Sequence, residues 1–85
     1  MQVLATFHNR THALQFANQL RVMGVNVRII NTPREISTSC GLSIMFDFNQ
    51  LNKARVTINS NRFTSFKGFY LKKQDGRMYG FEKIN

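Results

Sequence analysis

Hydrophobic residues near the N-terminus follow two different periods. They alternate loosely over Gln2–Phe7, which predicts a first strand. From Asn9 or Thr11, either of which can cap a helix, the spacing becomes helical, and Gly24 ends the predicted helix as its C′ residue. The buried face of this helix is expected to hold Ala13, Phe16, Ala17, Leu20 and Met23.

Two further strands and a second helix follow. The second strand is predicted from Val25, Val27 and Ile29, and the third from Leu42, Ile44, Phe46 and Phe48. Asp47 or Asn49 can cap the second helix, whose buried stripe would be Leu51, Ala54 and Ile58.

The C-terminal residues carry a hairpin signal. The runs Phe66–Gln74 and Arg77–Ile84 flank Asp75-Gly76, a dipeptide typical of two-residue hairpin turns. With the turn centred on that dipeptide, one face of the hairpin pairs Tyr70 with Phe81 and Lys72 with Tyr79.

The order of elements predicts an α+β fold, a ferredoxin-like β-α-β-β-α-β two-layer sandwich with an additional C-terminal hairpin strand, in one domain over residues 1–85. Because crossover connections are right-handed, the first two strands should run parallel on either side of an antiparallel third. Their carboxyl ends then lie at the same edge of the sheet. We therefore expect the His8–His12 turn and the Asn31–Gly41 loop to share one rim.

Composition narrows the possible classes of protein. The chain has 85 residues, 42% of them hydrophobic with eight Phe, so a packed core is expected rather than disorder. No stretch approaches the ~20 apolar residues of a membrane span, and the N-terminus has no basic leader. A single Cys makes no internal disulfide, which favours a reducing, cytoplasmic location. The net charge of +8 favours polyanions or acidic protein surfaces as partners.

The segment around the cysteine carries strong local signals. Thr32-Pro33-Arg34-Glu35 fits a capping box, with Pro at the first helical position, and predicts a short helical turn over residues 33–37. Gly41, directly after Cys40, permits a tight or left-handed bend. The thiol is therefore expected on a preorganised loop.

Several neighbours have the chemistry to activate Cys40. A thiol becomes nucleophilic as its thiolate, and nearby cations lower its pKa from about 8.5. Arg34 is the nearest cation in sequence, and His12 is expected on the same rim. Ser37 and Ser39 offer hydroxyl donors and Gly41 an open backbone amide. The alternative is a buried, inert cysteine, because Cys40 has the parity of the core positions of the third strand.

Other chemistries find little support in the sequence. One Cys and two His lack the spacing of a metal site, so no metal is expected. The four acidic residues form no catalytic pair, and no Gly-rich phosphate loop occurs. We therefore expect neither a cofactor nor an enzyme.

The basic hairpin leaves a second function open. Its aromatic and basic side chains, similar to the RNA-reading strand of RRM domains, would be Lys67, Tyr70, Lys72, Lys73 and Tyr79. In RRM domains, however, that motif lies on the third strand, whereas here it lies on the fourth. The hairpin has two other interpretations. It can be a protein-docking surface, or an edge hairpin whose Lys residues protect it from pairing with other chains.

The string Pro33-Arg34-Glu35-Ile36-Ser37-Thr38-Ser39-Cys40-Gly41 resembles the hallmark of a small bacterial family of selenium/sulfur carrier-like proteins. The resemblance extends from the first helix to about Phe46, with departures at Asn18 and Asn31-Thr32. It implies a carrier that holds sulfur or selenium on Cys40, with a cysteine-desulfurase-type donor and an acceptor protein as partners. The alternative is a basic nucleic-acid-binding or regulatory interaction module with a structural cysteine. Monomer and homodimer remain equally open.

Overall fold

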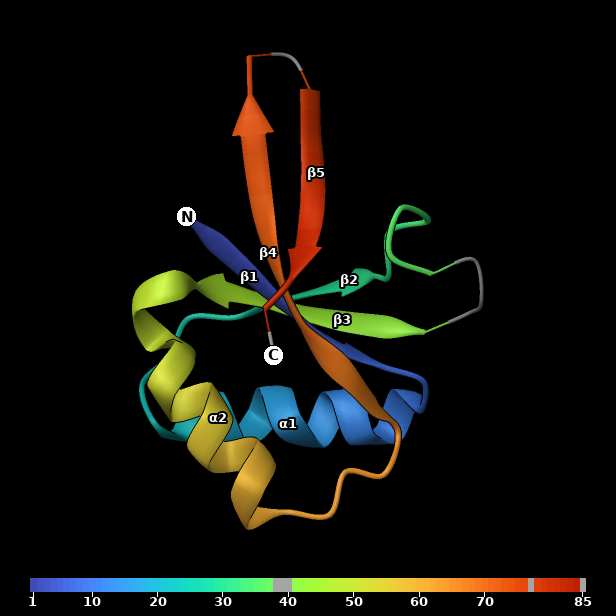
Figure 1. Ribbon diagram of the computed structural model, residues 1–85. Helices are drawn as coiled ribbons and strands as arrows, with labels where there is room; N and C mark the ends of the chain where they lie inside the picture. Colours follow the sequence, from blue (N-terminus) through green and yellow to red (C-terminus); the bar gives the residue numbers. More distant parts are fainter. Residues whose placement is uncertain (38–40, 77, 85) are drawn as a thin grey trace.

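The computed structural model describes residues 1–37, 41–76 and 78–84 (Figure 1). In chain order, the elements are β1 (Gln2–Phe7), α1 (Arg10–Val22), β2 (Arg28–Asn31), β3 (Leu42–Asp47), the 3-10 turn η1 (Phe48–Gln50), α2 (Leu51–Ser60), β4 (Phe66–Asp75) and β5 (Met78–Lys83). Thr38, Ser39 and Cys40 lie outside the described residues.

The strands form one five-stranded sheet in the order β2-β3-β1-β4-β5, and every neighbouring pair is antiparallel. This arrangement confirms the predicted α+β class. Because β3 is antiparallel to both β1 and β2, the first two strands run parallel to each other, as predicted. Their carboxyl ends therefore reach the same edge of the sheet.

In the described part of the chain, two helices cover one face of the sheet, and the core lies between them and the sheet (Figure 1). Its largest side chains are those of Phe7, Phe16, Phe46 and Phe69, all at most 2% exposed. Burial of each such side chain stabilises the fold by about 1.5–3 kcal/mol. Neither helix in the described part of the chain has the length and apolar character that a membrane crossing needs.

The predicted start and end of α1 are confirmed. The Asn9 side chain accepts a hydrogen bond from the His12 amide at 3.1 Å, and Gly24 follows the helix with a φ of +83°. The Val25 amide still donates to the Leu20 carbonyl at 3.0 Å. Val25 therefore belongs to the helix end, and β2 begins three residues later than the alternation suggested.

The hairpin register differs from the predicted one. Tyr70 lies opposite Lys83, and Lys72 lies opposite Phe81, because Asp75 pairs with Met78 and extends β4 by one residue into the predicted turn. Gly76, with a φ of +62°, directly follows this last pair. Since each partner moves by two positions, the side chains keep the faces that the sequence assigned to them.

The face opposite the helices, called the open face here, is partly covered as well. Leu4, Thr6 and Ser43 point to it and are at most 3% exposed. The turn over residues 33–37 and the β4–β5 hairpin both rise from this face, on either side of β1 (Figure 1). The turn over residues 33–37 therefore faces the basic hairpin across the sheet.

Candidate functional site

The loop from Thr32 to Gly41, called the motif loop here, joins β2 to β3 and is closed at its neck. Asn31 pairs with Leu42 as the last pair of the β2–β3 ladder. One residue further, the Thr32 amide donates to the Gly41 carbonyl at 3.1 Å. The two ends of the loop are therefore fixed to each other and to the sheet, whichever path the residues between them take.

Gly41 is required by a close approach of two backbone segments. A Cβ atom on this residue would lie 2.6 Å from the carbonyl oxygen of Phe7. The absence of a side chain brings the residue after Cys40 against the end of β1.

The first half of the motif loop forms the predicted helical turn. The Ile36 and Ser37 amides both donate to the Pro33 carbonyl, at 3.0 and 3.1 Å. The Thr32 hydroxyl, predicted to cap this turn, lies 2.9 Å from the Ser43 hydroxyl instead. This hydrogen bond attaches the start of the turn to the neighbouring strand β3.

A chain of three hydroxyl groups extends from this anchor. Ser43, which is fully buried, also lies 3.1 Å from the Thr6 hydroxyl on β1. Each hydroxyl carries one proton, and the three share two hydrogen bonds with one another, so one proton is left for a further acceptor. These hydrogen-bonded hydroxyl groups connect the motif loop to β3 and, through β3, to β1.

At the shared rim, a hollow of about 300 Å³ opens beside Gly41. It is lined by His8, Arg10, Asn31, Gly41 and Leu42. The structure therefore confirms the rim predicted from strand topology. Its two basic side chains come from the β1–α1 turn (His8) and the first residue of α1 (Arg10). The hollow reaches the residue that directly follows Cys40 in the chain.

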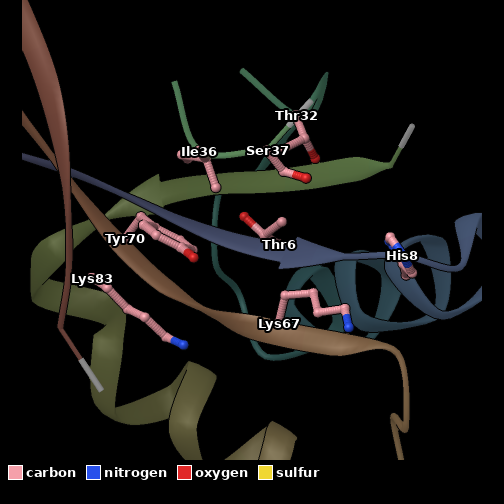
Figure 2. A pocket seen from close by; sticks show the side chains of 8 residues that line it. All are labelled: Thr6, His8, Thr32, Ile36, Ser37, Lys67, Tyr70 and Lys83. Atoms are coloured by element: carbon pink, nitrogen blue, oxygen red, sulfur yellow. The ribbon is translucent and has the colours of Figure 1, made fainter. Parts of the chain in front are cut away.

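A larger cavity of about 350 Å³ separates the motif loop from the hairpin, and we call it the loop–hairpin cavity. Figure 2 shows three groups of side chains around it: Thr32, Ile36 and Ser37 from the motif loop, Thr6 and His8 from β1 and the residue after it, and Lys67, Tyr70 and Lys83 from the hairpin. The hydroxyl of Tyr70 and the ammonium of Lys83 point inward. His8 borders both this cavity and the rim hollow.

Lys67 reaches the cavity because of an irregularity in β4. Thr6 lies opposite Gly68, but the next residue, Phe7, lies opposite Phe66, so Lys67 is the extra residue of a β-bulge. Strict alternation would place Lys67 on the face opposite to Tyr70. The bulge turns it toward the open face instead.

The predicted carrier residues have different surroundings. Arg34 is exposed on the turn, and Ser37 lies in the wall of the loop–hairpin cavity. Cys40 and Ser39 lie outside the described residues. The Nδ1 atom of His12 lies 2.8 Å from the Ser65 hydroxyl, and its ring lies against Phe63 in the helix layer.

The predicted nucleic-acid residues separate into two groups. Lys67 and Tyr70 line the loop–hairpin cavity, whereas Lys72 and Tyr79 line a separate cavity of about 230 Å³. In the latter, the Lys72 ammonium lies 5.1 Å from the centre of the Tyr79 ring. Lys73 forms a surface ion pair with Glu82 at 2.8 Å. The hairpin therefore does not present its cations as one continuous strip.

Sequence reasoning did not single out some of the cavity residues. Thr6 had a signal, since its parity in the first strand is opposite to that of the core residues. His8 and Arg10 lie in or beside the turn that topology placed at the rim. Lys83 had a signal for its face, since it alternates with Tyr79 and Phe81, but its position opposite Tyr70 depends on the hairpin register.

The family model described as "Putative Se/S carrier protein-like" matches residues 2–71, a range that includes the whole motif loop and ends within β4. No curated protein and no solved structure matches the chain.

Proposed function

The chain belongs to the Se/S carrier protein-like family, and from this premise we propose that it carries a sulfur or selenium atom on Cys40 between two protein partners. A carrier needs a donor and an acceptor. We assign the donor to the cysteine-desulfurase type, which presents sulfur as a persulfide. The protein itself then works as a carrier rather than as an enzyme.

The observation that carries this proposal is the closed neck of the motif loop. The only cysteine of the chain lies in a loop whose ends are joined by the hydrogen bond from Thr32 to Gly41. Gly41 packs against the Phe7 carbonyl, and the rim hollow with His8 and Arg10 begins beside it. A fixed neck and flanking basic side chains suit a segment that must present one anionic sulfur to successive partners.

The transfer step is a thiolate–persulfide exchange. The Cys40 thiolate attacks the outer sulfur of the donor persulfide, a new sulfur–sulfur bond forms, and the donor's own sulfur–sulfur bond breaks and releases a thiolate. No external oxidant is needed, because one such bond replaces another. Delivery to the acceptor repeats the exchange, and selenium takes the place of the outer sulfur in the same scheme.

In this proposal the neighbours of Cys40 stabilise the anion. Arg34 supplies a cation, Ser37 and Ser39 supply hydroxyl donors, and Gly41 supplies its backbone amide. His12 would tune protonation from the helix layer. The +8 charge would guide an acidic partner to the protein.

The ferredoxin-like description of the fold is part of the proposal. It is supported by the β2-β3-β1-β4 portion of the sheet and by the helices that cover one of its faces. In such a sandwich, β5 is the added edge strand.

The test is mass spectrometry of the protein after incubation with a cysteine desulfurase and cysteine. Wild type should gain one sulfur at Cys40, and Cys40→Ser should gain none. The same incubation with selenocysteine tests selenium. If wild type gained no more mass during the incubation than Cys40→Ser did, the carrier function would be wrong.

A second candidate function is favoured by one observation, the aromatic side chains on the open face. Tyr70, Tyr79 and Phe81 lie there beside Lys72, and aromatic rings with nearby cations bind single-stranded nucleic acid by stacking. In that case Cys40→Ser binds RNA as well as wild type does.

A further inference from the structure

The loop–hairpin cavity brings together basic and hydroxyl groups from four separate segments. Lys67 and Lys83 come from β4 and β5, His8 follows β1, and the hydroxyls of Tyr70 and Ser37 come from the hairpin and the motif loop. None of the described lining residues is acidic. The cavity is therefore electropositive and rich in hydrogen-bond donors.

We propose that this cavity binds the phosphate group of a small phosphorylated molecule. The inference goes beyond sulfur carriage, because it concerns a second ligand, and none of the residues that would hold it is the cysteine.

The positions of the two lysines follow from backbone features. The β-bulge brings Lys67 to the open face, and the hairpin register places Lys83 directly opposite Tyr70. Residues directly opposite each other on one face of a sheet lie close together. Two ammonium groups thus approach the cavity from neighbouring strands, on the side away from the motif loop (Figure 2).

The hydroxyl chain supplies one hydrogen-bond donor from the opposite side. Thr6 and Thr32 both line the cavity, and both are bonded to the buried Ser43 hydroxyl. One proton of this chain is left over for another acceptor. A ligand oxygen in the cavity can accept this proton. The sheet fixes the position of the hydroxyl groups, because Thr6 and Ser43 lie on neighbouring strands.

The number and charge of the donors favour phosphate over carboxylate. A phosphate monoester brings three acceptor oxygens and a charge between −1.5 and −2, approximately, at neutral pH. A carboxylate brings two oxygens and one charge. Two ammonium groups with several hydroxyls match the first more closely.

The size of the cavity indicates that the phosphate belongs to a larger molecule. A volume of about 350 Å³ lies within the range of roughly 300–1,000 Å³ typical of small-ligand pockets. The Ile36 side chain and the Tyr70 ring provide apolar surface in the same wall. The motif loop and the hairpin bound the cavity on two sides, which favours a compact ligand over a continuous nucleic-acid strand.

The test is isothermal titration calorimetry of the whole protein with inorganic phosphate, AMP and acetate. We expect one site per chain, with AMP binding more tightly than inorganic phosphate and acetate more weakly than either. Lys67→Gln and Lys83→Gln should each weaken AMP binding by about tenfold, the effect of one lost hydrogen bond to a charged group. Tyr70→Phe, which keeps the ring, should weaken it by a smaller factor.

Lys73→Gln is the matched control, because it removes the same charge from the same strand outside the cavity. It should bind AMP as wild type does. An equal loss in Lys73→Gln, or no binding of phosphate and AMP to wild type, would overturn the proposal. So would binding of a short oligouridylate alone, which would assign the face to nucleic acid.

Cys40→Ser separates this inference from sulfur carriage. It should bind AMP with unchanged affinity, even though it gains no sulfur. A loss of AMP binding in this variant would contradict a site built from the cavity residues alone.

Discussion

The Thr32 hydroxyl lies 2.9 Å from the Ser43 hydroxyl and ties the first residue of the motif loop to the middle of the sheet. Ser43 is fully buried and also forms a hydrogen bond with Thr6, so the loop is attached to both β3 and β1. The anchor and the amide bond from Thr32 to Gly41 together hold the neck of the loop. The first two predictions concern this neck.

Thr32→Val should lower the free energy of unfolding by about 1 kcal/mol, the usual contribution of one hydrogen bond. The variant keeps the shape of the side chain, and Ser43 keeps Thr6 as a partner. Urea denaturation measures the change. Thr64→Val, the same substitution at an exposed position, is the control and should be nearly neutral. Equal stability of the two variants would show that the anchor contributes nothing.

Gly41→Ala should destabilise the protein by roughly 1–3 kcal/mol, because the new Cβ atom would lie 2.6 Å from the Phe7 carbonyl oxygen and the strand must shift. Gly80→Ala is the matched control, since a Cβ atom there meets nothing within 4 Å. Urea denaturation should separate the two variants clearly. If both changed stability alike, the close approach would not be the reason for glycine at position 41.

Arg34→Gln should slow alkylation of Cys40 at neutral pH by a few-fold. One surface cation near a thiolate contributes on the order of 1 kcal/mol, and its loss reduces the thiolate fraction. The rate with iodoacetamide, followed from pH 5 to 10, measures this effect. Arg62→Gln, at another exposed position, should react as wild type does. A thiol that reacts only in the unfolded protein would contradict the carrier function.

Lys72→Glu combined with Lys73→Glu should slow sulfur loading by a donor and leave the alkylation rate of Cys40 unchanged. Surface charges act mainly on the rate of encounter with a charged partner. The loading rate at low and high salt measures the effect, which salt should diminish. Lys53→Glu with Arg62→Glu makes the same change of charge elsewhere on the surface and should slow loading less.

The nucleic-acid alternative predicts a different result for the same hairpin. Tyr79→Ala would then weaken binding of single-stranded RNA by roughly 1–3 kcal/mol, and affinity would fall steeply with salt. The contact between the Lys72 ammonium and the Tyr79 ring is compatible with both functions and does not distinguish them. Loading kinetics and RNA binding of the same variants therefore distinguish the two functions.

Local patterns were sufficient to predict most of the elements. The Asn9 cap and the Gly24 stop follow from interactions between residues close in sequence. The helical spacing of apolar residues predicted the core face of α1 correctly as far as Leu20, whereas Met23, also expected there, is 39% exposed. The rim shared by the β1–α1 turn and the motif loop was also predictable, because the handedness of crossovers restricts how the first two strands are placed. Boundaries that depend on competing backbone hydrogen bonds were not predictable. The start of β2 is one example, because the Val25 amide bonds to the end of α1 and not to the sheet.

The sequence alone therefore determines the α+β class, the closed turn after Pro33 and the match to the Se/S carrier protein-like family over residues 2–71, which include the motif loop. Only the tertiary structure decides what this motif faces. The position of Lys67 depends on a one-residue bulge, and that of Lys83 on the hairpin register. Both are settled by pairing between distant strands, since a bulge or a register shift leaves the local residue pattern unchanged while it alters which side chains meet.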